Sequence, residues 1–320
     1  MTKEISDYDK YGYDYEAYWR DSDVNRDYED KSERSAIKKL LKRVKRGNLT
    51  AQAGWFCDLG AGFGRLTDIY RDLFFNVVLV DYSLENLKKA HERVEKSFKE
   101  SPDHKNPNIF FIAANAYHLP FRPDALDCVM TVRMTHHMED VGAVIKEIAR
   151  TTRSGGKLVL EFANKKHFFE VIRAVFKRSK MSPFTLEPKK RGDDLFYNFH
   201  PKYIKRELTN AGFHIQKTVS SSNLRHKFFK KVLGVKVMIF IDKVLQPVFN
   251  LLRFGPSIFV LAEKKQKGRD DIVVNKYQDI SDILICPKCG SDDLMILKPE
   301  IRCKKCEKAY SIVDGIYDFR

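Results

Sequence analysis

The stretch WFCDLGAGFGRLT, residues 55–67, joins an apolar run to glycines at positions 60, 62 and 64. The run is rich in aromatic side chains and predicts a buried strand, and the apolar spacing after Gly64 predicts a helix. A tight turn must join the two, so the start of the helix presents free backbone N–H groups beside the glycines. Such a turn favours the binding of an anion or a polar cofactor.

The spacing of the glycines differs from that of two common nucleotide-binding loops. A dinucleotide-binding loop would carry its third glycine at position 65, which is Arg65 here. A phosphate-binding loop would end in Gly-Lys-Ser or Gly-Lys-Thr, which this stretch lacks.

The residues that follow favour a nucleoside without a pyrophosphate group. The run NVVLVDYS contains Asp81, 21 residues after Gly60, where a carboxylate can accept hydrogen bonds from both ribose hydroxyls. The third apolar run ends at Asn115 and Ala116, where a side-chain amide and a backbone N–H can contact an adenine edge.

Five apolar runs alternate with helical patterns between residues 55 and 165. This alternation predicts an α/β fold with a doubly wound, Rossmann-like parallel sheet, whose ligand lies over the carboxyl ends of the strands. Segments 213–222 and 255–265 predict a sixth and a seventh strand.

In this order and spacing the motifs resemble those of class I S-adenosylmethionine-dependent methyltransferases. They are D-x-G-x-G-x-G at Asp58 to Gly64, the acidic Asp81, the Asn115–Ala116 corner followed by L-P-F, and R-x-x-x-x-G-G at Arg150 to Gly156. The resemblance covers about residues 50–265. It implies a seven-stranded sheet whose last two strands are antiparallel, and S-adenosylmethionine as the cofactor.

The resemblance also implies a cofactor site. Gly60 and Gly62 would let the backbone approach the methionine part of the cofactor, with Asp58 close to it, and Asp81 would hold the ribose. Position 115 is aspartate in many relatives, and an asparagine can still bond the adenine amino group through its oxygen. The full expected set is Asp58, Gly60, Gly62, Asp81, Tyr82, Asn115, Ala116 and Arg133.

Two adjacent histidines are the candidates for catalysis. His136 and His137 directly follow the fourth apolar run, where the acceptor enters in the family, so either can act as a general base if the acceptor must lose a proton. His118 is a weaker candidate. The alternative is that these histidines only shape their loop or contact the edge of the cofactor.

Four cysteines near the C-terminal end form a second motif, C-x2-C, thirteen residues, C-x2-C. Two such pairs suit tetrahedral coordination of zinc, and four cysteine ligands leave no position for water, so the zinc should be structural. The ligands would be Cys286, Cys289, Cys303 and Cys306. Cys57 and Cys128 lie in apolar runs and are expected to be small buried side chains.

Residues 282–320 resemble the small zinc-ribbon activator that partners tRNA, rRNA and protein methyltransferases, down to the closing Y-S-I-V-D-G-I. The resemblance implies that the ribbon either covers an apolar face of the catalytic domain or helps to hold RNA through its lysines.

Two further segments are expected to lie near the site. The tyrosine-rich N-terminal stretch either folds over the cofactor, with Arg26 and Tyr28 closing the pocket, or packs as a surface latch. Segment 220–255 predicts an amphipathic helix, either an apolar lid or interfacial helix or an ordinary helix packed on the sheet edge. Its polar positions Lys236, Lys243, Gln246, Asn250 and Arg253 share one face.

These patterns predict the following division of the chain. Residues 1–48 form an N-terminal cap and helix, 49–267 the methyltransferase domain with the lid at 220–255, 268–281 a linker, and 282–320 the zinc ribbon.

The charge is uneven and bears on the partner. The chain has a net charge of +15, and residues 164–268 hold 23 basic and seven acidic side chains. Either the region is a solvated lysine-rich surface or it faces an anionic partner, nucleic acid or membrane. The stretch LPFRPDALDCVMTVRMTHHMED resembles small-molecule methyltransferases of ubiquinone and menaquinone synthesis. The resemblance favours a small-molecule acceptor, and the apolar, basic segment 220–255 favours a lipid-like or isoprenoid acceptor bound near an anionic membrane. RNA is the alternative.

The expected location of the protein is the cytoplasm, peripheral to the membrane. The start of the sequence, MTKEISDYDK, has no apolar core of the kind found in secretory signals.

Overall fold

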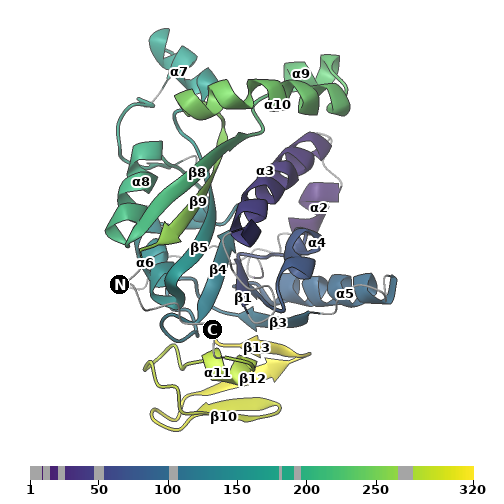
Figure 1. Ribbon diagram of the computed structural model, residues 1–320, viewed down its shortest axis with the longest axis vertical. Coiled ribbons are helices and arrows are strands. Elements are labelled where there is room, and N and C mark those ends of the chain that lie inside the picture. Colours follow the sequence, from purple (N-terminus) through teal and green to yellow (C-terminus); the bar gives the residue numbers. More distant parts are fainter. Residues whose placement is uncertain are drawn as a thin grey trace.

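One mixed β-sheet runs through the protein and carries helices on both faces (Figure 1). The computed structural model describes residues 9, 15–20, 26–46, 54–100, 107–179, 182–190, 196–265 and 277–320. The central strands are β1 (Trp55–Leu59), β2 (Asn76–Asp81), β3 (Asn108–Ala113), β4 (Leu126–Thr131), β5 (Thr152–Ala163), β8 (Phe213–Ser221) and β9 (Ser257–Lys264).

The strands follow the order β3-β2-β1-β4-β5-β9-β8. The first five are parallel, whereas β9 runs antiparallel between β5 and β8. The doubly wound sheet of seven strands expected from the sequence is confirmed, including its antiparallel last pair.

Helices cover both faces of this sheet (Figure 1). They are α2 (Tyr15–Arg20), α3 (Asp27–Arg46), α4 (Thr67–Tyr70), η1 (Arg71–Leu73), α5 (Leu84–Glu100), η2 (Thr135–His137), α6 (Val141–Thr151), α7 (Phe168–Val175), α8 (Pro201–Asn210), α9 (Lys227–Val232), α10 (Val235–Leu252) and α11 (Ile280–Ile283). Of these, α7, α9 and α10 lie at the end that is uppermost in Figure 1. A two-stranded hairpin joins β6 (Lys189–Lys190) to β7 (Tyr197–Asn198).

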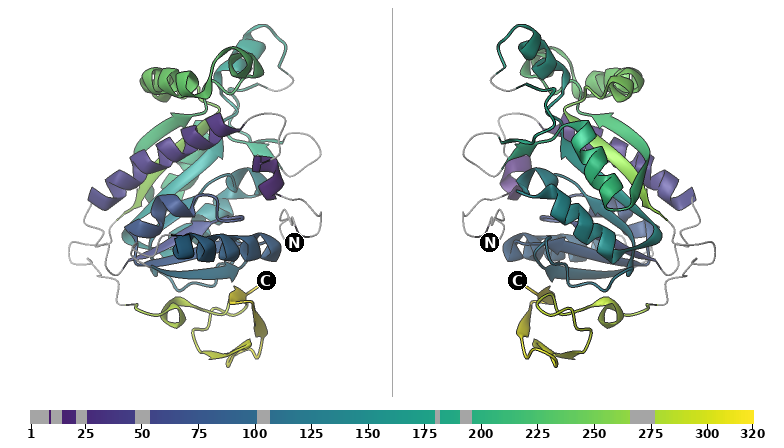
Figure 2. Two further views of the ribbon diagram at one scale, coloured as in Figure 1. Left: turned by 90° about the vertical axis from the view of Figure 1, so that its right-hand side faces the viewer. Right: turned by 90° about the vertical axis from the view of Figure 1, so that its left-hand side faces the viewer.

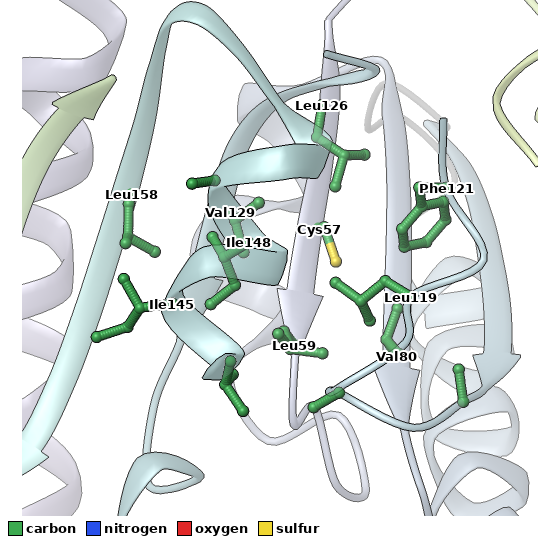
Figure 3. Packing of buried hydrophobic residues seen from close by; sticks show 14 of the residues in the cluster. Cys57, Leu59, Val80, Leu119, Phe121, Leu126, Val129, Ile145, Ile148 and Leu158 are labelled. Carbon is green, nitrogen blue, oxygen red and sulfur yellow. The ribbon is translucent and has the colours of Figure 1, made fainter. Parts of the chain in front are cut away.

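The hydrophobic core is split by the sheet, because alternate side chains of a strand point to opposite faces. Cys57 and Leu59 of β1 pack toward α6, with Ile145 and Ile148 (Figure 3). Phe56, between them in the sequence, packs with residues of α3 and α5 on the other face. Cys57 and Cys128 are fully buried, as the sequence predicted.

The zinc-ribbon segment does not form a sheet of its own. Its strands β10 (Leu294–Leu297), β11 (Glu300–Cys303), β12 (Ala309–Val313) and β13 (Ile316–Asp318) continue the central sheet, which therefore has eleven strands. The junction is a parallel pairing of β13 with β3, in which Ile316 lies opposite Phe111. The edge strand β3 of the seven-stranded part of the sheet is thereby covered instead of being left open.

Contacts before the ribbon strengthen this junction. Ile283, the last residue of α11, and Leu284, which follows it, are fully buried in the core that α6 also joins. Leu284 forms a β-bridge with Phe121, and Ile285 donates its N–H to the carbonyl of Pro120 at 3.0 Å. Most of the expected linker, residues 268–276, lies outside the described residues.

The segment between β8 and β9 forms the expected helix, α10, which contacts α3 and β8. Lys236 and Lys243 are exposed, whereas the amide of Gln246 points inward and donates to the carbonyl of Ser220 at 3.0 Å. Within the described ranges, none of the helices combines the length and hydrophobicity that a membrane-spanning segment requires.

Candidate active site

The glycine loop turns sharply after β1 because its residues adopt backbone angles that favour glycine. Gly60 has a φ of 81° and its N–H donates to the carbonyl of Val80 at 2.8 Å. A Cβ at this position would lie 2.7 Å from the Cβ of Met134. Both the backbone angle and the packing therefore require glycine here.

Asp81 lies at the end of β2, beside this loop. Its Oδ2 accepts the N–H of Gly62 at 2.7 Å and its Oδ1 accepts the N–H of Ser83 at 2.9 Å. Burial raises its pKa, and the two backbone N–H groups act in the opposite direction. These bonds fix the carboxylate at the carboxyl edge of the sheet, where parallel-sheet proteins bind their ligands.

A pocket opens at this edge, between the ends of β1, β2 and β4. It contains seven of the eight residues that the sequence predicted for the cofactor, namely Gly60, Gly62, Asp81, Tyr82, Asn115, Ala116 and Arg133. Asn115 turns its Oδ1 to the N–H of Tyr117, at 2.9 Å. The sequence motifs, which are spread over 74 residues from Gly60 to Arg133, therefore meet in one cavity.

Tyr15 of α2 covers the pocket, and the cavity that remains is about 70 Å³. The Tyr15 ring packs edge-on against Phe63, and a Cβ at Gly62 would lie 3.2 Å from it. Ligand pockets usually measure about 300–1,000 Å³, so the cavity with Tyr15 in this position is smaller than a typical ligand site.

The N-terminal cover differs from the one expected. Tyr28 does not reach the pocket, because its hydroxyl accepts the N–H of Leu224 at 2.9 Å and its ring packs with Met238. Arg26 lies 3.7 Å from the ring centroid of Tyr18. The prediction that Arg26 and Tyr28 close the pocket is therefore wrong, since long-range packing draws Tyr28 to α10. In the sequence, the aromatic residues of α2, YEAYWR, could have indicated that this helix lies over the pocket.

A buried ion-pair network supports the far wall of the pocket. Arg133 donates from Nε to Glu33 of α3 at 2.7 Å, and Arg65 donates to the same carboxyl group at 2.8 Å. Burial acts to raise the pKa of Glu33, but the two guanidinium groups outweigh it and hold that pKa below its usual range. Arg133 also donates its N–H to Glu161 at 2.9 Å. Glu33 and Glu161, which sequence reasoning missed, therefore orient Arg133.

The comparison with known proteins agrees with this geometry. Residues 57–160 match the family model described as "Methyltransferase domain". Residues 57–160 are therefore similar to a methyltransferase domain. The matched range holds the glycine loop, Asp81, Asn115 and Arg133, so the predicted resemblance is confirmed on the residues that carried it.

Relatives of the methyltransferase domain match over a limited length. A demethylmenaquinone methyltransferase of Renibacterium salmoninarum is 32% identical over 108 residues, which cover 33% of this chain and 40% of that protein. An uncharacterized protein of Methanocaldococcus jannaschii is 31% identical over 108 residues, 34% of this chain and 40% of its own. The chain thus spans about 40% of the length of these curated relatives.

A solved structure shares the fold of the methyltransferase domain. Magnesium protoporphyrin IX methyltransferase from Synechocystis, solved with bound SAH, is 17% identical and has a TM-score of 0.52. The match covers 81% of this chain and 96% of that one. At this identity the likeness shows the Rossmann-like fold alone.

Asp58 is the one expected cofactor residue that does not line the pocket of the methyltransferase domain. It is 2% exposed and accepts a hydrogen bond from the Tyr70 hydroxyl at 2.6 Å. Burial raises its pKa to about 7, and the Tyr70 bond opposes this rise. A role for Asp58 toward the cofactor stays a prediction.

The two candidate histidines of the methyltransferase domain differ in position. His137 lines the pocket, whereas His136 lies behind it, with its ring 4.3 Å from that of His137 and 4.5 Å from that of Phe196. Burial lowers the pKa of His136 well below its usual value, so this imidazole is neutral and a weak base. Of the two, His137 is the better placed to meet an acceptor. His118 is exposed and does not line the pocket.

The four ribbon cysteines form a cluster far from the cofactor loop in sequence. Their sulfur atoms all lie within 4.8 Å of one another, with 3.7 Å between Cys286 and Cys306 and 3.6 Å between Cys289 and Cys303. Ligands 2.3 Å from a tetrahedral zinc ion lie about 3.8 Å apart. The cluster therefore fits the geometry of a four-cysteine zinc site, as the spacing predicted.

Proposed function

We propose that this protein transfers a methyl group from S-adenosylmethionine to a small, lipid-like or isoprenoid acceptor. The observation that carries the proposal is the pocket at the carboxyl edge of the sheet, where Gly60, Gly62, Asp81 and Asn115 meet within the range that matches the methyltransferase family.

The donor groups of the pocket fit the parts of this cofactor. The carboxylate of Asp81 would accept the ribose hydroxyls, and the amide of Asn115 with the N–H of Ala116 would contact the adenine. The positive φ of Gly60 and the closeness of Met134 keep the loop free of side chains where the methionine part must approach. Tyr15 would exclude water once the cofactor is bound.

In methyl transfer the protein mainly has to position the acceptor and the cofactor relative to each other. When bound, S-adenosylmethionine supplies an electrophilic methyl group on a sulfonium. The protein must hold the acceptor in line with that methyl group and remove a proton if the acceptor carries one. His137, at the wall of the pocket, would take this proton, while His136 and Phe196 hold its ring in place.

A structural zinc ion is part of the proposal. Cys286, Cys289, Cys303 and Cys306 would bind it, and four thiolates would complete its coordination without water. The role of the metal would be to hold the ribbon strands so that β13 can pair with β3.

The acceptor class rests on the relatives. The Renibacterium relative is a demethylmenaquinone methyltransferase, which favours a quinone-like or isoprenoid acceptor here. Such an acceptor would place the protein in the cytoplasm at a membrane surface. RNA is the second candidate and rests on the positive charge of the chain and on the lysines of the zinc ribbon, and the relatives described above bring it no support.

The test is transfer of labelled methyl from S-adenosylmethionine into a cell extract that is then divided into organic, RNA and protein fractions. Asp81→Ala serves as the inactive variant, and Glu92→Ala, an exposed carboxylate of α5, as the matched control. We expect label in the organic fraction with wild type and control and none with Asp81→Ala.

The other outcomes each decide something. Label in the RNA fraction would overturn the proposed acceptor while keeping methyl transfer. Tight cofactor binding without label in any fraction would overturn the proposed enzymatic function.

Replacement of the two histidines tests the base. His137→Gln should lower kcat strongly with little change in cofactor affinity, whereas His136→Gln should act mainly through the position of His137. Equal pH profiles of kcat in wild type and His137→Gln would argue against a general base at this position.

A further inference from the structure

Helix α10 turns an apolar stripe toward solvent. Val237, Phe240, Val244, Val248 and Leu251 are between 48% and 82% exposed. Their spacing of three and four residues places them on one side of the helix. A surface helix ordinarily buries such a stripe against the core.

The opposite side of α10 is held to the protein by polar bonds. Asp242 is 4% exposed and accepts from Ser32 at 2.8 Å and from Asn223 at 2.5 Å. Asn250 accepts the N–H of Ser220 at 2.5 Å. Because these buried groups need their partners, the helix cannot roll over to hide its apolar side without leaving polar atoms unpaired.

Helix α7 extends this exposed stripe. Its residues Val175 and Phe176, the latter just after the helix, are each 69% exposed. Phe168 of α7 is 41% exposed and its ring lies 6.3 Å from that of Phe249 of α10. Both views of Figure 2 show the two helices at the same end of the molecule. We call the exposed side chains of these two helices the apolar surface of α7 and α10.

A basic cavity adjoins this surface. The cavity measures about 890 Å³. Its walls include Phe168 of α7 and Phe254, which follows α10. Among the residues that the structure describes, the walls carry one carboxylate, Glu170, and six Lys or Arg side chains, which are Lys165, Arg173, Arg178, Lys189, Lys190 and Arg225.

Glu170 neutralises only part of this charge. It pairs with Lys189 at 3.1 Å and with Arg173 at 3.2 Å. The cavity therefore keeps a net positive charge that favours an anionic group.

The same sign of charge surrounds the helices. Residues 222–256 contain seven Lys or Arg and a single acidic residue, Asp242, which is buried. The exposed Lys236 and Lys243 flank the apolar stripe. An apolar stripe bordered by cations is typical of helices that lie in the interface of an anionic membrane.

We propose that the apolar surface of α7 and α10 docks on an anionic phospholipid bilayer and that the basic cavity beside it holds a lipid phosphate group. The exposed side chains of α10 enter the boundary between head groups and acyl chains, and Lys236 and Lys243 stay at the level of the phosphates. The proposal goes beyond methyl transfer and does not depend on which acceptor is used.

Binding to vesicles tests the proposal with the full chain and no methyl acceptor. Vesicles of phosphatidylcholine are compared with vesicles that also contain phosphatidylglycerol, in a co-sedimentation assay. We expect binding to the anionic vesicles, weakened by salt, and little binding to the neutral ones.

Two variants separate the apolar from the charged contribution. Phe240→Ser combined with Val244→Ser should weaken binding at least about 10-fold, because two large apolar side chains leave the interface. Leu297→Ser, at a side chain 62% exposed in the ribbon, is the matched control and should bind like wild type. Equal loss in both would contradict the assigned surface.

In the cavity, Lys190→Gln combined with Arg225→Gln should weaken binding about 5-fold for each charge removed. Lys146→Gln, at an exposed lysine of α6, is the control and should change nothing. Neutral and anionic vesicles bound equally would overturn the role of the cavity.

Two other occupants remain as outcomes against the proposal. Inorganic pyrophosphate bound at the cavity as tightly as the vesicles would make it a site for a free anion. Dimers in solution that Phe240→Ser abolishes, together with an absence of vesicle binding, would make the surface an interface between two copies of the chain. Either result leaves the proposed methyl transfer untouched.

Discussion

The guanidinium group of Arg320, just after β13 of the ribbon, lies 5.7 Å from the ring centroid of Tyr82, and its Nη1 donates to the Tyr82 carbonyl oxygen at 3.2 Å. Tyr82 lines the cofactor pocket and follows Asp81 directly. Arg320 also pairs with Asp9, at 3.5 Å. The ribbon thus contacts the loop that positions the expected ribose ligand.

Arg320→Ala should therefore weaken the binding of S-adenosylmethionine. The loss of one partly exposed hydrogen bond and ring contact corresponds to about 1 kcal/mol, or roughly 5-fold in Kd. Isothermal titration calorimetry measures this change. Arg302→Ala, which removes only a surface pair with Glu300 in the same ribbon, should leave Kd unaltered.

Gly60→Ala should destabilise the fold and abolish cofactor binding. The substitution adds backbone strain at a φ of 81° and a contact of 2.7 Å with Met134. Together these effects should lower the free energy of unfolding by about 2–4 kcal/mol, measured by urea denaturation.

Gly212→Ala separates the two effects. Gly212 has a φ of 86°, but within the described residues no atom outside its chain neighbours lies within 4 Å of an added Cβ. In this variant only the backbone strain should lower the free energy of unfolding, by about 1–2 kcal/mol. Cofactor binding should stay normal. An equal loss of stability in both variants would show that the Met134 contact is relieved at no cost.

The pH dependence of stability should carry a contribution from Asp58. Its pKa in the folded protein is about 7, because the side chain is buried, whereas an unfolded aspartate titrates near pH 3.9. Between these values the folded protein retains a proton that the unfolded chain has lost. The free energy of unfolding should therefore fall as pH rises from about 4 to about 7.

Asp58→Asn removes this dependence. The stability of the variant relative to wild type should rise across that interval by about 4 kcal/mol at most, measured by denaturation at several pH values. Tyr70→Phe should raise the upper limit of the interval and leave the lower limit unchanged, because the Tyr70 hydroxyl stabilises the charged carboxylate in the folded protein alone. Parallel pH curves for wild type and Asp58→Asn would refute a raised pKa.

Removal of the proposed zinc ion should destabilise the catalytic sheet as well as the ribbon. The metal would hold the strands that let β13 cover β3 and keep Ile283 and Leu284 buried. Exposure of two such side chains costs about 4 kcal/mol, or roughly 8–16 °C in Tm.

Calorimetry with a chelator measures this loss, and metal analysis should find one zinc ion per chain. Cys303→Ser should reproduce the effect, whereas Cys128→Ala, in the core of the sheet, should lower Tm without loss of metal. If the unfolding transition of the central sheet kept its Tm after the metal was removed, the ribbon would fold independently of that sheet.

Local sequence was enough to predict most of the central fold. The apolar runs, the glycines of the turn after β1 and the spacing of Asp81 are short-range features, since strand periodicity and turn geometry depend on neighbouring residues. The cysteine spacing belongs to the same class, because the two ligands of each pair lie on one tight turn.

Local sequence patterns did not predict the positions of Tyr28 and of the two histidines. Tyr28 bonds Leu224, 196 residues away, and this contact has no counterpart in the local pattern. His136 and His137 are adjacent in sequence, but only His137 lines the pocket, whereas His136 is buried.

The sequence by itself determined a doubly wound sheet, a glycine loop after its first strand and a four-cysteine cluster. Tertiary structure decided that Tyr15 covers the pocket, that the ribbon extends the catalytic sheet through β13, and that α10 turns its apolar side outward. The physical reason is that these last features depend on which buried polar and apolar groups find partners across the chain, as Asp242 does with Ser32 and Asn223. Periodicity shows that a helix has an apolar side, and only its long-range partners determine which side faces the core.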